Sequence, residues 1–362
     1  MNKILKNFTS IIIINFSIFI FIVLFCLVSF SIYIGYKSYN FPLRSSLFYP
    51  SLIITDDERG YRLKNFLDVN YPFGSNNYYR IFSDQEGNRV LKKNFLPKKS
   101  IDILAVGDSQ TFGHGVNYQD TYIARVASQL NLKELNAAVS GYGSAASIIT
   151  AEQNIIKSPK IIVYGYYHDH AARSFSKCYP GFSFSCISVP HIKIIDQKPV
   201  LIKSKENSNQ IDLLRNYNAY ITGNLGNFSF YEDFIWQARR TVADFLQRSP
   251  IFFGRKAPNL KEEEIINNYL FSKLSVLTKN NNSRVIIVYI PKYFDIPVEH
   301  PPAYLKLMAK KYNFEFLDMT KTFREEISKN GLKSIMIQND GHLNEYGHKL
   351  IANNLLHIIK MF

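Results

Sequence analysis

The sequence has few cysteines, glycines, prolines and acidic residues, and the first three of these shortages exclude classes of protein. Three cysteines among 362 residues exclude a scaffold built on disulfides, and 17 glycines and 14 prolines are too few for a fibrous chain. A hydrophobic share of 46% and an aromatic share of 15% exclude a disordered one. There are 29 acidic against 43 basic residues, and the resulting net charge of +14 favours anionic partners such as nucleic acid, acidic glycans or lipid head groups.

Charge is also absent from one long stretch near the N-terminus. No charged residue lies between Lys6 and Lys37, and residues 11–34 are almost continuously Ile, Phe, Leu and Val. About 20 apolar residues suffice to span a bilayer core, and the preceding Lys3 and Lys6 favour an inside N-terminus. We expect residues 1–37 to be a single-pass membrane anchor and the rest to be periplasmic or otherwise extracytoplasmic. A cleaved signal peptide is the alternative, but its apolar core is usually only ~7–15 residues.

Export changes the expectation for the two cysteines outside this stretch. Cys178 and Cys186 flank a turn signal, Pro180-Gly181, and an oxidising compartment would allow them to pair. Two unrelated thiols are the alternative, because connectivity does not follow from sequence alone.

The remainder of the chain divides by texture. Residues 38–100 are rich in Tyr, Asn, Asp and Gly, and the similar pieces 57–62 and 84–89 look like tight turns between short strands. This segment is interpreted as a small β-rich lead-in. From residue 101 to 362 strand-like and helix-like runs alternate, with a polar, irregular insertion at about 178–230.

This alternation predicts an α/β fold, a doubly wound (flavodoxin-like) parallel sheet flanked by helices, with ligands at the carboxyl ends of the strands. The expected strands are 101–106, 135–139, 161–166, 284–290 and 314–317. The expected helices are 121–130, 144–156, 231–246, 262–277, 303–312 and 346–359.

Two segments could carry chemistry. Val106-Gly107-Asp108-Ser109 follows a buried strand, where an exposed turn can present Ser109 as a nucleophile. It is neither a lipase elbow, since Thr111 stands where Gly is needed, nor a P-loop. Near the other end, Asp340 and His342 lie two residues apart ahead of the last helix, so that one loop could supply a general base and the carboxylate that orients it. Read alone, each segment could instead be a turn with a helix cap.

Together the two segments resemble the SGNH, or GDSL-type, hydrolase family. Its first block, Gly-Asp-Ser-x-Thr-Phe-Gly-x-Gly-Val, is similar to residues 107–116, and its last block to residues 340–347. The resemblance implies a serine esterase with Ser109, His342 and Asp340 as the catalytic residues. It also implies an oxyanion hole formed by the backbone of Ser109, by Gly141 of the second block, and by a side chain of the third block.

Two departures from the family pattern concern individual residues. The third block normally supplies an Asn as oxyanion donor, and His168 stands there; an imidazole N–H can still donate. The more common Asp-x-x-His spacing would put Asn339 in the acid position. We assign the role to Asp340, because Asn carries no charge to stabilise imidazolium.

Other chemistries fit less well. Residues 141–146 match a dinucleotide fingerprint but lack the acidic residue expected about 20 positions later. His168, Asp169 and His170 with His342 could form a metal cluster, but no third well-spaced ligand is evident. Dispersed lysines and export argue against nucleic acid. We therefore expect no metal and no organic cofactor.

The sequence thus predicts a membrane-anchored esterase that acts on an ester-bearing substrate, with envelope glycans or lipids as candidates. An O-acyltransferase that acetylates envelope polysaccharide would use the same residues with a different acceptor. A catalytically inactive glycan-binding or assembly protein is the third alternative, and the His168 departure favours it.

Overall fold

The structure is a computed structural model that describes residues 2–40, 52–73, 77–93, 99–177, 188–204, 258–292, 302–338 and 340–361, together with residues 238 and 242. Cys178, Cys186, Asn339 and most of the helix expected at 231–246 lie outside these ranges. By contacts the chain divides into two compact units, residues 1–43 with 224–253 and residues 44–223 with 254–362.

The first unit contains helix α1, Asn2–Asn40. Within it, the 25 residues Ile12–Tyr36 are long and apolar enough to cross a membrane. At 1.5 Å per residue they extend over roughly 37 Å, against a hydrocarbon core of about 30 Å. This agrees with an anchor or a signal sequence by length and composition.

The second unit is built on an eight-stranded sheet with the strand order β12-β11-β8-β6-β7-β5-β4-β3. The five strands from β12 to β7 are parallel, and β5, β4 and β3 are antiparallel to their neighbours. The parallel strands are β6 (Ile103–Gly107), β7 (Glu134–Asn136), β8 (Ile161–Tyr167), β11 (Arg284–Ile290) and β12 (Glu315–Asp318). Numbered along the chain, they run 2-1-3-4-5, which confirms the predicted doubly wound, flavodoxin-like sheet.

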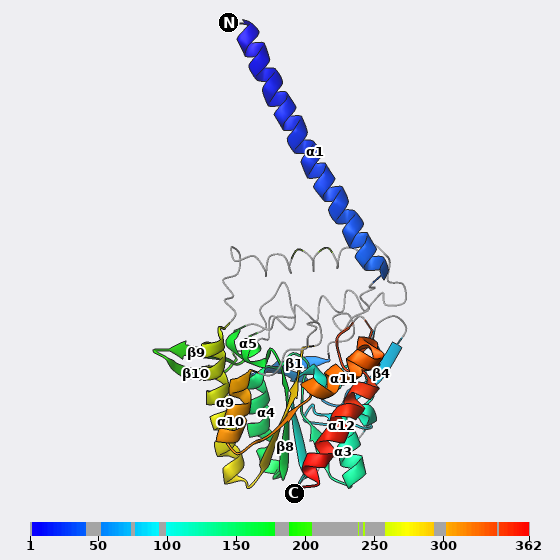
Figure 1. Ribbon diagram of the computed structural model, residues 1–362, viewed down its shortest axis with the longest axis vertical. Coiled ribbons are helices and arrows are strands. Elements are labelled where there is room, and N and C mark those ends of the chain that lie inside the picture. Colours follow the sequence, from blue (N-terminus) through cyan, green and yellow to red (C-terminus); the bar gives the residue numbers. More distant parts are fainter. Residues whose placement is uncertain are drawn as a thin grey trace. The chain divides into compact units, whose positions relative to one another are not determined.

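Helices cover both faces of this sheet (Figure 1). The faces are apolar because β6, β8 and β11 are buried runs of Ile, Val, Leu, Ala and Tyr. One core lies under α4 (Ser144–Asn154), α9 (Leu260–Asn280) and α10 (Ala303–Lys311). The other lies under α3 (Tyr122–Leu130), α11 (Thr320–Asn330) and α12 (Glu345–Ile359).

The sheet continues across the boundary expected at residue 100. Strands β3 (Asp68–Phe73), β4 (Asn77–Ser83) and β5 (Arg89–Val90) extend it, since β5 pairs with β7. A separate hairpin, β1 (Ile53–Asp56) and β2 (Gly60–Leu63), precedes them. The segment is β-rich as expected, and it shares one compact unit with residues 101–223.

Several short elements were not expected. They are α2 (Ser109–Phe112), α5 (His170–Phe175), the β9–β10 hairpin (His191–Ile195 and Lys198–Ile202), and α11. The hairpin lies in the stretch expected to be an irregular insertion. α11 was missed because its sequence is mostly polar, and only Phe323 is a buried apolar residue within it.

Candidate active site

Ser109 stands at the carboxyl end of β6, directly after two residues that turn the chain. Gly107 has φ +150°, and it pairs with Gly165 of the neighbouring strand β8. A Cβ at either glycine would collide with the Thr111 side chain, which packs over both. Two adjacent glycines therefore allow the turn after β6 to fold back onto the sheet edge and place Ser109 there, 9% exposed.

The Asp108 side chain stabilises this turn, and the sequence analysis did not predict Asp108 as a functional residue. Its side chain accepts a hydrogen bond from the backbone N–H of Gln110 at 3.0 Å and caps α2. Arg173 Nη1 donates to its other oxygen at 3.0 Å, and His170 Nε2 lies 3.5 Å away. Burial alone would raise the pKa of Asp108, but His170, Arg173 and the Gln110 N–H lower it to about 2. The Asp108 carboxylate is therefore a fixed negative charge in the turn that carries Ser109.

The structure brings Ser109, His342 and Asp340 together. His342 Nε2 lies 2.8 Å from Ser109 Oγ, and His342 Nδ1 contacts Asp340 Oδ1 in a hydrogen bond. Burial would raise the pKa of Asp340, but His342 and His114 lower it below its ordinary value. A carboxylate that stays ionised beside one imidazole nitrogen, with a hydroxyl on the other, is the arrangement needed to move a proton off that hydroxyl.

Gln110 links the turn that carries Ser109 to the loop that carries His342. Its Nε2 donates to the carbonyl of Gly341 at 3.1 Å, and its Oε1 accepts from the N–H of Leu343 at 3.1 Å. Both bonds are buried and bracket His342 along the backbone. The residue after the nucleophile therefore fixes the loop that carries the base, a role visible only once the fold brings positions 110 and 342 together.

His114 lies beside His342 and Asp340, and the sequence analysis did not identify it as a site residue. Its ring lies 4.5 Å from that of His342, centre to centre, and its Nδ1 is 3.0 Å from Tyr79 Oη. Burial, His342 and Arg89 lower the pKa of His114 to about 3, although Asp340 opposes them. His114 is therefore neutral at neutral pH and adds no repulsion when His342 gains a proton.

One nitrogen or oxygen from each of His114, Asp340 and His342 lies within 4.8 Å of the others, which meets the distance requirement for a metal site. Two of these side chains already bond to each other, and Tyr79 occupies His114 Nδ1. These contacts favour acid–base chemistry at this place. The cluster that the sequence analysis considered and set aside was a different one, residues 168–170 with His342.

Gly141 lies in a tight turn that follows β7, which ends at Asn136. The N–H of Tyr142 donates to the carbonyl of Val139 at 3.2 Å, and Gly141 has φ +87°. A positive φ at the third residue of a hydrogen-bonded turn is typical of a type II turn and favours glycine there. A hollow beside the turn is lined by Gly141, Gly143, Val189 and Arg173, among others. Arg173, the cation among the described residues that line this hollow, pairs with Asp108 and Asp169.

His168 follows the end of β8 in a turn. Its ring packs against Tyr167, and among the described residues no hydrogen bond links it to Ser109 or His342. Burial, Lys292, Arg173 and His170 lower its pKa against the influence of Asp169. Because β8 ends at Tyr167, His168 and His170 do not share a strand face; His170 begins α5, fully buried, with Nδ1 3.0 Å from Tyr164 Oη.

Arg89 is the largest fully buried side chain of the segment 52–93. It donates to the carbonyls of Phe112, Gly113 and Val116, all on the loop that follows Ser109. Burial lowers its pKa to about 10. The sequence of residues 84–89 predicts only a tight turn, and it does not indicate that Arg89 hydrogen-bonds to the loop that follows Ser109.

His348 lies on α12, the last helix of the chain. It is buried, and its Nδ1 accepts from the N–H of Tyr122 at 3.3 Å. Burial, with Arg89, Arg125 and His342, lowers its pKa to about 3, against about 6.5 in the unfolded chain. Between about pH 6.5 and pH 3 the unfolded chain binds this proton and the folded chain does not, so stability falls as the pH falls through that range.

We predict that His348→Gln reduces this acid sensitivity. The free energy of unfolding, measured by urea titration between about pH 6 and 4, should depend on pH less steeply than in the unsubstituted protein, by about 1.4 kcal/mol per pH unit. Parallel curves for the two proteins would show that His348 is not held neutral by the fold.

Comparisons with known proteins find similar solved structures at low sequence identity. No family model matches the sequence, and no curated protein matches it. Among solved structures, the chain is similar to a protein of the G-D-S-L lipolytic family from Desulfitobacterium hafniense DCB-2, with 10% identity, a TM-score of 0.38, and coverage of 71% of this chain and 98% of the other. It is similar to TesA, with 12% identity, a TM-score of 0.36, and coverage of 72% and 98%. It is also similar to a two-domain esterase active on acetylated mannans, with 13% identity, a TM-score of 0.39, and coverage of 72% and 49%.

Proposed function

We propose that this chain is an SGNH-type serine hydrolase that cleaves ester bonds. The observation that carries the proposal is the continuous contact from Ser109 Oγ through the His342 ring to the Asp340 carboxylate. Ser109 and His342 are 233 residues apart in the sequence. Both lie, with Asp340, at the sheet edge where doubly wound folds bind ligands. The match of residues 107–116 and 340–347 to the family blocks supports the same reading.

The mechanism follows from the order of these contacts. Ser109 Oγ attacks the ester carbonyl while His342 Nε2 takes its proton, and Asp340 stabilises the imidazolium that forms. His342 then gives this proton to the leaving alcohol, whose C–O bond breaks, and Ser109 holds the acyl group. Water, or the hydroxyl of an acceptor, next attacks the acyl-enzyme and releases Ser109. Asp108, Arg173 and Gln110 contribute by keeping the nucleophile and the base in position.

The tetrahedral oxyanion is held by the backbone N–H groups of Ser109 and Gly141, with His168 as the candidate third donor. For His168 we predict that His168→Asn keeps much of the activity, whereas His168→Ala lowers kcat by ~10²–10³, the effect of removing one such donor. The loss should fall on kcat rather than KM, because the donor acts where charge develops. Equal, unchanged kcat values for both variants would remove His168 from the mechanism.

The fate of the acyl group distinguishes a hydrolase from a transferase. The full chain in detergent would be given acetylated glycans and simple acyl esters, with and without a glycan that has free hydroxyls. A hydrolase releases free acid at a rate that the acceptor does not change. Acyl groups on the acceptor would instead indicate an O-acyltransferase, and no turnover under either condition would favour a binding or assembly protein.

We further propose that α1 anchors the enzyme in a membrane with the second unit on the extracytoplasmic side. Lys3 and Lys6 before the span Ile12–Tyr36 support this orientation. A reporter that works only in the cytoplasm, fused after Phe362, should then be silent. Envelope glycans or lipids are the substrates that this location would offer.

A further inference from the structure

We infer that Tyr61, from the segment that precedes the first parallel strand, is a positioning residue that orients the Gly141 N–H in the oxyanion hole; this inference rests on the proposed function. Tyr61 Oη donates a hydrogen bond to the carbonyl of Ser140 at 2.8 Å. That carbonyl and the N–H of Gly141 belong to the same peptide unit. In a planar trans peptide the two groups point in opposite directions. A donor that holds the carbonyl on one side therefore directs the N–H to the other.

This peptide is the part of the turn that most needs such a contact. The turn from Val139 to Tyr142 places Gly141 at φ +87°. Type I and type II turns differ chiefly in the orientation of the central peptide, so a flip of the 140–141 peptide would reverse the Gly141 N–H and remove it from the oxyanion. Because Tyr61 stabilises one orientation of the carbonyl, it disfavours that flip. The hydrogen bond that the Ser140 carbonyl accepts also polarises the peptide unit, which makes the Gly141 N–H a stronger donor.

Tyr61 is itself held firmly. Its ring is buried and packs edge-to-face on Tyr142 with centroids 5.4 Å apart, and Tyr142 Oη donates back to the carbonyl of Tyr61. The two tyrosines thus exchange contacts across the turn. Neither hydroxyl has to be desolvated without a partner, which removes the usual cost of burying it.

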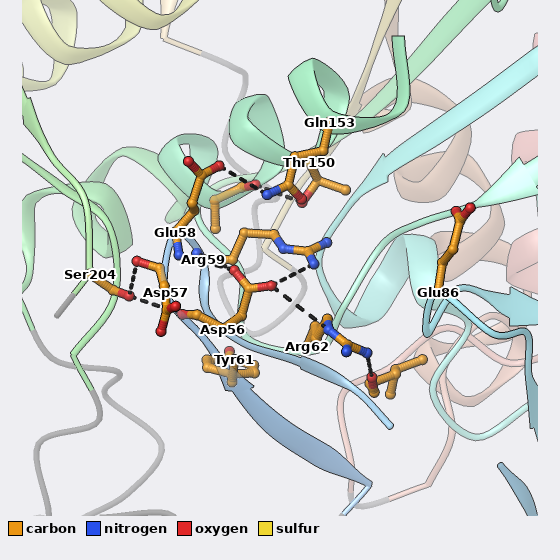
Figure 2. A network of polar contacts seen from close by, with 12 residues as sticks. Asp56, Asp57, Glu58, Arg59, Tyr61, Arg62, Glu86, Thr150, Gln153 and Ser204 are labelled. Atoms are coloured by element: carbon orange, nitrogen blue, oxygen red, sulfur yellow. Dashed lines mark hydrogen bonds and ion pairs between the residues drawn. The ribbon is translucent and has the colours of Figure 1, made fainter. Parts of the chain in front are cut away.

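The hairpin that carries Tyr61 is fixed by a polar network (Figure 2). Asp56 accepts from the backbone of Glu58 and Arg59 and from the Arg59 guanidinium, which closes the turn between β1 and β2. Gln153 of α4 donates to Glu58 at 3.0 Å, and Ser204 after β10 donates to the carbonyls of Asp56 and Asp57. Since α4 begins two residues after Tyr142, the hairpin and the turn are attached to the same helix.

The test compares Tyr61→Phe with Tyr118→Phe. Phenylalanine keeps the ring of Tyr61 and removes only the hydroxyl that holds Ser140. Tyr118 is the matched control, because it is also buried and its hydroxyl donates to Glu134 at 3.2 Å, outside the turn. We expect Tyr61→Phe to lower kcat about 5- to 10-fold with KM unchanged, the factor one net hydrogen bond contributes. Tyr118→Phe should leave kcat unchanged.

A spectroscopic measurement reads the peptide directly. Gly141 is the only one of the 17 glycines that follows a serine. Full-length protein in detergent, labelled with carbonyl-¹³C serine and ¹⁵N glycine, therefore gives one carbonyl-correlated amide signal, that of the 140–141 peptide. This signal should move in Tyr61→Phe and stay in place in Tyr118→Phe.

Each outcome decides the inference. A signal that does not move in Tyr61→Phe shows that the hydroxyl does not hold the peptide. A signal that moves without a change in kcat shows that the contact has no catalytic role. If the unsubstituted protein neither turns over esters nor reacts with a serine-directed fluorophosphonate, the proposed function fails, and the position of the signal still decides whether Tyr61 orients the peptide.

Discussion

Ser109→Ala should lower kcat for ester hydrolysis by about 10⁶-fold, because the alanine leaves His342 without a hydroxyl to activate. The methyl group removes one oxygen at a site that is already 9% exposed and well packed, so the fold should persist. The measurement is acid release from an acylated substrate by the full chain in detergent, with the thermal midpoint recorded for both proteins.

Ser147→Ala is the matched control for this substitution. Ser147 is buried in α4, and its hydroxyl has no hydrogen-bond partner among the described residues. Its loss should leave kcat unchanged. A Ser109→Ala protein that melts normally and retains more than about a hundredth of the original kcat would exclude Ser109 as the nucleophile.

The second large effect is expected at Asp340. Asp340→Asn should lower kcat by about 10⁴-fold, because an amide can hold His342 in the wrong tautomer and cannot stabilise imidazolium. The carboxylate is ionised under ordinary conditions, since His342 and His114 lower its pKa despite its burial. KM should change little, because Asp340 contacts the base and not the substrate.

Asn339 provides the comparison, since the common family spacing would give it the acid's position. Asn339→Ala should keep most of the activity, while Asp340→Asn loses nearly all of it. If the Asn339 variant lost more kcat than the Asp340 variant, the assignment of the orienting group to Asp340 would be wrong.

The sheet could be predicted from the sequence because its strands are buried on both faces. Such strands appear as short continuous apolar runs, and 161–166 and 284–290 correspond closely to β8 and β11. Helices with an apolar stripe, such as α12, could be placed from the helical spacing of their buried residues. α11 could not, because one buried phenylalanine in a polar segment gives no periodicity.

The residues expected at the catalytic centre could be named because their types and order match a known pattern. The residues that hold them could not. Gln110, Arg89 and Tyr61 bond to backbone carbonyls and N–H groups of positions 23 to 233 residues away. Any residue type can supply a backbone acceptor, so the sequence does not reveal these contacts. For that reason the segment before residue 100 looked like a lead-in, although Tyr61, Tyr79 and Arg89 each contact a different part of the site.

The same limit applies to His168. The resemblance to the family placed it by position alone, after the end of β8, whose neighbour β6 comes directly before the Ser109 turn. Whether a ring at that position reaches an oxyanion depends on the turn after Tyr167, which the spacing of residues does not determine. The His168 variants described above decide this by activity.

The most direct test of the account is covalent labelling with a fluorophosphonate, followed by peptide mapping of the full chain. The reagent forms an adduct only with a serine that a neighbouring base has activated. We predict one adduct, on the peptide that contains Ser109, formed at a rate that falls sharply in His342→Ala. A folded protein that gains no adduct, or gains it at another serine, would contradict the account.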